Sequence, residues 1–150
     1  RDDWKKPTKE GFDCVGMIGR AAHICHIPFF YKNTTTLSRH MAPLKANQKI
    51  EEGDLIWFHG HVMVVSSLSK NTLIEARGYS NGHGKVEEIP LKKVFKGIQT
   101  YKQLKQTYLK KKHIVILDRK GNPIMKRKNF KILKMSSCWD KLPSSKKQVI

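Results

Sequence analysis

The sequence predicts a mixed α+β domain, in which one amphipathic helix precedes a run of antiparallel strands. Apolar residues recur at helical spacing over residues 14–26, which places them on one face of a helix. Short apolar runs separated by turn residues then follow over residues 52–89, as in successive β-hairpins. A chain of 150 residues is long enough for one such domain with a core of its own.

Both predicted helices of the first third have recognisable ends. Asp13 stands where an N-cap residue of the 14–26 helix would, and Pro28 stops that helix. A second, short helix is expected after residues 33–36, which are rich in capping side chains, and Pro43 would end it. The first of these helices is expected to pack against the sheet.

The middle of the chain predicts short strands joined by tight turns. Their positions are residues 55–58, 62–65, 72–76 and the surroundings of Val86. The intervening turns contain Glu52-Gly53, His59-Gly60 and Ser69-Lys70-Asn71, and a longer loop covers residues 79–84. Residues 90–95 suit a short helix.

The last third has a separate character. Residues 101–150 hold 15 of the 30 basic side chains and two of the 12 acidic ones. We expect there a helix over 101–109, a strand over 113–117, a glycine-containing turn over 118–122 and a partner strand over 124–134. The chain therefore divides into a core domain at residues 1–100 and a basic C-terminal hairpin extension at 101–150, packed on or flanking the same domain.

The formal net charge of +18 predicts attraction to polyanions, such as nucleic acid, anionic lipid or an acidic cell wall. No segment has the signature of a defined nucleic-acid-binding fold, so we expect no specific nucleic acid partner. A lysine-rich surface that only aids solubility is the alternative. No apolar run approaches the ~20 residues that a membrane helix needs, and we expect no transmembrane segment.

Three cysteines, Cys14, Cys25 and Cys138, are an odd number, so at least one is unpaired within a monomer. Cys14 lies in the first turn of the predicted helix, where the helix dipole and unpaired backbone N–H groups stabilise a thiolate. Cys14 is therefore the candidate nucleophile. An inert core thiol is the alternative interpretation.

A thiolate enzyme needs a base that titrates near neutral pH, which indicates histidine. His59 and His61 stand two residues apart and would share one face of an extended strand, so spacing alone does not choose between them. His23, His26 and His40 fit no common zinc-ligand spacing, and we expect no metal site.

Four segments of the chain share their order with the motifs of one family. They are Gly11-Phe12-Asp13-Cys14-Val15-Gly16, Glu51-Glu52-Gly53-Asp54-Leu55-Ile56-Trp57-Phe58, His61-Val62-Met63-Val64-Val65 and Leu73-Ile74-Glu75-Ala76. This order resembles the NlpC-type cell-wall cysteine peptidases, a papain-like clan, over roughly residues 4–95. The resemblance implies a papain-like fold, in which an N-terminal helix carrying the nucleophile packs on an antiparallel sheet.

The resemblance also implies residue roles. Cys14 matches the nucleophile, His61 the general base and Glu75 the third, polar residue, for which His83 is the alternative. Substrate-binding positions are assigned to Trp4, Asp13, Val15 and Gly60. Val15 stands where the family has serine, so the implied chemistry is closer to the family pattern than the implied specificity is.

The activity implied by the resemblance is hydrolysis of peptidoglycan stem-peptide amide bonds, at the γ-D-glutamyl to diamino acid linkage, through an acyl-enzyme and without metal or organic cofactor. The expected location is periplasmic, wall-associated or secreted, with any signal segment outside this sequence. The basic extension would bind an anionic wall polymer or lipid surface. The alternatives are a papain-like amidase or acyltransferase acting on another substrate, and a catalytically silent basic module that binds a polyanion.

Overall fold

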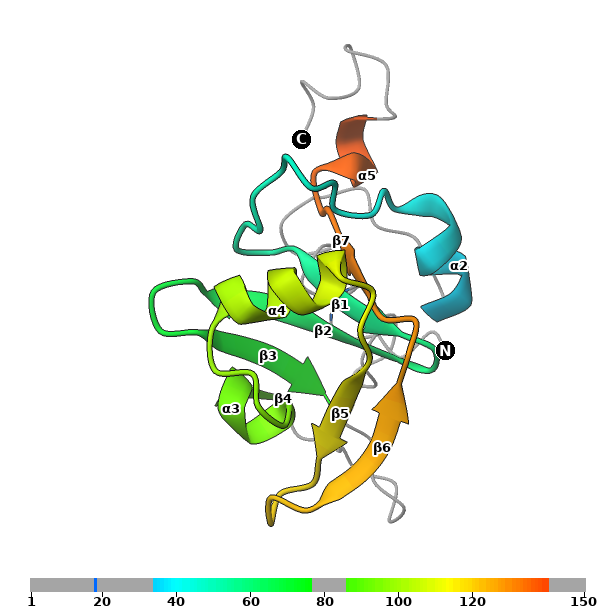
Figure 1. The fold of residues 1–150 in the computed structure, drawn as a ribbon. Coiled ribbons are helices and arrows are strands. Elements are labelled where there is room, and N and C mark those ends of the chain that lie inside the picture. Colours follow the sequence, from blue (N-terminus) through cyan, green and yellow to red (C-terminus); the bar gives the residue numbers. More distant parts are fainter. Residues whose placement is uncertain (1–17, 19–33, 77–85, 141–150) are drawn as a thin grey trace, which may run out of the picture.

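The computed structural model describes Ile18 and residues 34–76 and 86–140 (Figure 1). The helices are α2 (Thr34–His40), α3 (Leu91–Val94), α4 (Tyr101–Leu109) and α5 (Ser137–Asp140). The strands are β1 (Leu55–Phe58), β2 (His61–Ser67), β3 (Thr72–Ala76), β4 (Val86–Pro90), β5 (Ile114–Leu117), β6 (Pro123–Arg127) and β7 (Lys131–Leu133). The predicted α+β class with an antiparallel sheet is confirmed. Apart from Ile18, the predicted helix over residues 14–26 lies outside the described residues.

The main sheet has five strands in the order β4-β3-β2-β1-β7, and every neighbouring pair is antiparallel. Strands β5 and β6 form a separate two-stranded hairpin, as predicted for the basic extension. Three of the four links in the main sheet join strands that are consecutive in sequence, and short turns connect β1 to β2 and β2 to β3.

Alternate side chains of the central strands enter two different apolar clusters, one on each face of the sheet. From β1, Ile56 and Phe58 pack with Leu104 of α4 in what we call the α4-side cluster. Leu55 and Trp57 pack with Leu37 of α2 in the α2-side cluster. Burial on both faces explains why β1 is apolar throughout rather than alternating.

Different elements cover the two faces. Residues of α3, α4 and β5 fill the α4-side cluster, and Figure 1 shows α4 lying across the sheet. The α2-side cluster contains α2, Ile18 and Cys138. Ile18 is helical and 4% exposed. Among the described residues, no helix combines the length and apolar character needed to span a bilayer.

The strand predicted over residues 124–134 is wrong in one respect, because it divides into two strands. β6 pairs with β5, but β7 leaves the hairpin and pairs with β1, with Ile56 opposite Ile132. Ile132 and Leu133 are fully buried, one in each apolar cluster, and this burial favours the main sheet over a longer hairpin. The last strand of the basic extension thus belongs to the main sheet.

A partly buried ion-pair cluster joins β7 to the start of β1, with Lys134 and Asp54 buried and Glu51 exposed. Lys134 Nζ lies 2.6 Å from Asp54 Oδ2 and 2.7 Å from Glu51 Oε1, and it also donates to the Lys49 carbonyl at 2.9 Å. Burial alone would lower the pKa of the Lys134 ammonium, but its bonds to the two carboxylates outweigh burial and raise it. Asp54 also accepts from the backbone N–H of Met135 at 3.0 Å.

Candidate active site

His61 is held at one end of the main sheet by the turn that precedes it. Residues 59–60 form the turn between β1 and β2, and Phe58 pairs with His61 across it. Gly60 has φ = 88°, in the left-handed region that favours glycine, and a Cβ there would meet no atom within 4 Å. The need for glycine is therefore conformational, and the substrate-binding role expected of Gly60 stays a prediction.

Glu75 lies on β3 beside His61 and is 3% exposed. His61 Nε2 and Glu75 Oε2 are 3.0 Å apart, a hydrogen-bond distance, and the His61 side chain keeps 13% of its surface exposed. Glu75 is two residues from Leu73 on the same strand, so both point to the α4 side of the sheet. A buried carboxylate thus faces an imidazole that solvent can reach.

An aromatic ring supports the imidazole from the neighbouring strand. The Phe58 and His61 ring centroids lie 5.5 Å apart with an interplanar angle of 50°. The Arg127 guanidinium carbon lies 5.6 Å from the Phe58 centroid, within cation–π range. The basic hairpin therefore brings a positive charge next to the ring that packs against His61.

A second carboxylate stands directly opposite Glu75. Glu87 on β4 pairs in register with Glu75, and like charges at such positions destabilise a sheet. Each carboxylate has its own cationic or protonatable partner, because Arg119 Nη2 lies 3.2 Å from Glu87 Oε1 while His61 bonds Glu75. Arg119 belongs to the β5–β6 turn, so the extension helps to offset charge at this site.

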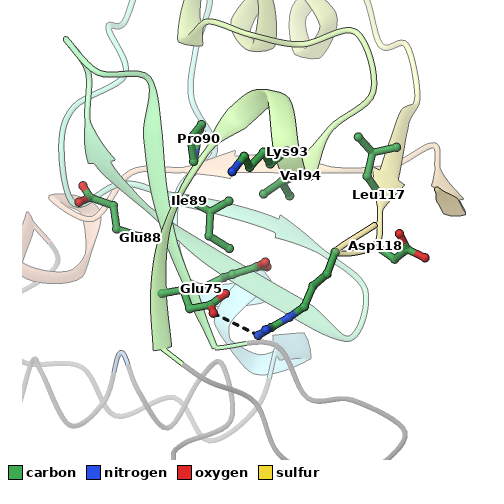
Figure 2. Close-up of a pocket in the computed structure, with 10 residues that line it drawn as sticks. Glu75, Glu88, Ile89, Pro90, Lys93, Val94, Leu117 and Asp118 are labelled. Carbon is green, nitrogen blue, oxygen red and sulfur yellow. Dashed lines mark hydrogen bonds and ion pairs between the residues drawn. The ribbon is translucent and has the colours of Figure 1, made fainter. Parts of the chain in front are cut away.

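A cavity of about 470 Å³ adjoins Glu75. Figure 2 shows Glu75 at one end of it, Ile89 and Val94 along its wall, and a dashed line for the Arg119–Glu87 ion pair. Both acidic and basic side chains line this cavity. The walls come from β3, β4, α3 and the β5–β6 turn, with residues Glu75, Glu87, Glu88, Ile89, Pro90, Lys93, Val94, Leu117, Asp118 and Arg119.

Glu88 also lines this cavity but bonds elsewhere. Its carboxylate points away from Glu75 in Figure 2 and accepts hydrogen bonds from Ser66 Oγ at 2.5 Å and Thr72 Oγ1 at 2.9 Å. The bond from Ser66, and then that from Thr72, hold the pKa of Glu88 below its ordinary value. Glu88 therefore serves the β2–β3–β4 contact rather than the imidazole.

Of the predicted site residues, the structure brings His61 and Glu75 together. His59 is exposed in the turn. Cys14, the alternative third residue His83, and three of the proposed substrate-binding residues lie outside the described residues; those three are Trp4, Asp13 and Val15. The proposed roles of all these residues stay predictions.

Sequence reasoning missed the surroundings of the imidazole. Phe58 ends a predicted strand, and the two-residue turn after it already implies that Phe58 pairs with His61. No local sequence pattern predicts the contacts of the two arginines. Arg119 is 32 residues from its partner Glu87, and Arg127 is 69 residues from the Phe58 ring. Only the packing of the hairpin on the sheet creates them.

In the described part of the chain, no group of three His, Cys, Asp or Glu side chains is arranged to hold a metal ion. Comparisons with known proteins return nothing: no protein-family model, curated protein or solved structure matches this chain.

Proposed function

We propose that the chain is a papain-like cysteine peptidase that hydrolyses amide bonds of peptidoglycan stem peptides. In this proposal Cys14 is the nucleophile, His61 the general base and Glu75 the residue that orients the base. The observation that carries it is the 3.0 Å contact between His61 Nε2 and the buried Glu75 carboxylate. The order of the four sequence motifs supports the substrate class, including the γ-D-glutamyl to diamino acid bond.

The side of the imidazole that bonds Glu75 decides where its basic nitrogen lies. An ionised carboxylate only accepts hydrogen bonds, so Nε2 carries the proton in the neutral ring. The lone pair then resides on Nδ1, which is the atom that would take a proton from a thiol. Glu75 would also stabilise the imidazolium formed by that transfer.

The reaction follows from these two states of the ring. The Cys14 thiol gives its proton to Nδ1 of His61, and the thiolate attacks the amide carbonyl to form a tetrahedral oxyanion. Collapse of this intermediate breaks the C–N bond, and the leaving nitrogen takes the proton from the imidazolium. His61 then removes a proton from water, which attacks the thioester, and the acid product leaves as Cys14 recovers its proton.

The proposal fixes where the Cys14 sulfur has to lie. Ile18 is buried in the α2-side cluster with Val62, whereas the His61 side chain lies on the opposite, α4 side. In the predicted helix Cys14 precedes Ile18 by one turn. The proposal therefore requires the Cys14 sulfur to lie within hydrogen-bond reach of Nδ1 of His61, at the end of the sheet formed by the β1–β2 turn.

The decisive experiment is digestion of purified muropeptides with analysis of the products by mass spectrometry. Cys14→Ala and His61→Ala should each abolish turnover, because either change removes the thiolate–imidazole pair. Both variants should stay folded, although His61→Ala should be less stable because the buried Glu75 carboxylate loses its bond to His61. The matched control is His59→Ala, which removes an exposed imidazole two residues away and should retain full activity.

Normal hydrolysis by Cys14→Ala would contradict the proposal. Product masses separate the alternatives, because an acyltransferase attaches the acyl group to an added amine where a hydrolase releases the free acid. An intact substrate after incubation with the wild-type chain would favour the silent basic module or an enzyme that acts on another substrate.

A further inference from the structure

A basic groove of about 430 Å³ lies at the base of the basic hairpin, where the chain leaves α4 and where β6 continues into β7, whereas the cavity beside Glu75 adjoins the hairpin turn. Lys111 and Lys112 line it from the first segment, and Lys128 lines it from the second. Its other lining residues are Leu44, Tyr108, Leu109, Asn129, Phe130 and Lys131. None of the described residues that line this groove is a carboxylate, so the lysines repel one another there.

We propose that this groove binds the phosphate headgroup of an anionic phospholipid at a membrane surface. The proposal is independent of the peptidase activity and concerns a separate site. Among the described residues, no ion pair involves Lys111, Lys112 or Lys128. A phosphate diester placed between them would relieve their mutual repulsion and accept hydrogen bonds from their ammonium groups.

The backbone at Lys111 indicates that a side chain is kept there against conformational preference. Lys111 has φ = 54°, the left-handed conformation in which helices usually end on glycine. Its N–H donates to the Tyr108 carbonyl at 3.1 Å and that of Lys112 to the Thr107 carbonyl at 3.1 Å, which is the Schellman pattern. The helix dipole would favour lysines here, but it does not account for Lys128, which comes from another segment.

Apolar groups around the lysines favour a lipid over a nucleic acid. Of the exposed large apolar side chains among the described residues, Leu109 lines the groove itself, and Ile124 and Met125 lie farther along β6, towards the hairpin turn. Such a mixture of lysine and exposed apolar groups suits the boundary between headgroups and acyl chains.

The groove's aromatic rings are not available for base stacking. Phe130 is 6% exposed and meets Tyr108 edge-on, with ring centroids 5.8 Å apart. The Tyr108 hydroxyl donates to the Leu44 carbonyl at 2.9 Å, which holds this ring in place. Nucleic acid binding by stacking needs an open ring face.

The test is co-sedimentation of the whole chain with vesicles of equal parts phosphatidylglycerol and phosphatidylcholine, against vesicles of phosphatidylcholine alone. Binding should require phosphatidylglycerol and weaken with added salt. The triple variant Lys111→Gln, Lys112→Gln, Lys128→Gln should bind about a hundredfold more weakly. Its control removes three exposed lysines elsewhere, Lys70→Gln, Lys92→Gln, Lys102→Gln, and should bind within about threefold of the wild type.

A single variant separates binding from folding. Lys111→Gly removes one groove charge and should weaken vesicle binding, while its midpoint of thermal unfolding stays equal to or above that of the wild type because glycine suits the left-handed backbone. Equal vesicle binding by the two triple variants would overturn the proposal. So would binding to single-stranded DNA at physiological salt with none to the anionic vesicles.

Discussion

At the scale of single residues, Glu75 is the group whose position most needs an explanation. A carboxylate that is 3% exposed costs free energy unless it is hydrogen-bonded, and a second carboxylate, Glu87, stands opposite it. The bond to His61 offsets part of that cost. A carboxylate whose burial destabilises the folded state, and which bonds an imidazole, is typical of a functional site.

Replacing Glu75 tests whether its charge or only its hydrogen bond orients His61. In Glu75→Gln the amide oxygen can still accept from Nε2, so kcat should fall by about tenfold; in Glu75→Ala it should fall by about a hundredfold or more. Because the carboxylate stabilises the imidazolium, the acid limb of the pH profile of kcat/KM, which reports protonation of the base, should move to lower pH in Glu75→Gln.

The control for Glu75→Gln is Glu52→Gln, which removes an exposed carboxylate that accepts from the Leu68 N–H. Its pH profile should match the wild type. An unchanged profile in Glu75→Gln would show that Glu75 is a structural residue and not one that positions the base.

At the scale of elements, the join between β7 and β1 depends on Lys134. Its partner Glu51 has a pKa below the usual 4.5, because Lys134 donates a hydrogen bond to it and carries the opposite charge. In the unfolded chain Glu51 binds its proton at a higher pH, so the unfolded state takes up more protons in acid. The stability that this pair contributes is present above pH 4.5 and is lost as the pH falls through the lowered pKa.

Lys134→Met should therefore change both the stability and its pH dependence. Removing one partner leaves Asp54 buried without its ammonium, which should cost about 3 kcal/mol in the free energy of unfolding at neutral pH. The decline of stability in acid should be shallower than in the wild type, because Glu51 no longer has a lowered pKa. Urea unfolding at several pH values measures both effects.

Lys126→Met is the matched control for this prediction, because Lys126 is exposed on β6. We expect its unfolding curve to follow the wild type at each pH within about 0.5 kcal/mol. Parallel pH curves for Lys134→Met and the wild type would mean that the ion pair with Glu51 contributes nothing to the acid sensitivity.

The elements differ in how far the sequence predicts them. The strands β1, β2 and β3 follow from short apolar runs between turns, and their pairing follows from the tight connections between them. β7 could not be found in this way, since it pairs with a strand more than 70 residues earlier. What selects that pairing is burial of Ile132 and Leu133, which depends on the finished core.

The candidate site also has a part that the sequence predicts and a part that only the packing of distant segments creates. Motif order predicts that Glu75, or His83 in its place, orients His61, and the His61–Glu75 contact follows from two neighbouring strands. Arg119 and Arg127 reach the site only because the hairpin folds back on the sheet. No local pattern in the sequence specifies that packing.

At the scale of the whole molecule, the C-terminal segment should determine the stability of the sheet. Ile132→Ala leaves a cavity in the α4-side cluster and should lower the free energy of unfolding by about 2–5 kcal/mol. Ile124→Ala makes the same change on β6 at a side chain that is 47% exposed, and should alter it by less than about 0.5 kcal/mol. Denaturant titration of the two variants compares them directly, and equal losses would show that β7 is dispensable.

Both margins of the main sheet resist the addition of further strands. On one side β7 is three residues long, and its outer backbone is occupied by the bridge from Pro43 and the bond from the Leu44 N–H to the Ile132 carbonyl. On the other side β4 carries Glu87 and ends at Pro90, which has no N–H to donate. A sheet closed off at both edges in this way is a poor template for a strand of a neighbouring molecule, so strand addition at β4 or β7 should not drive association of this protein.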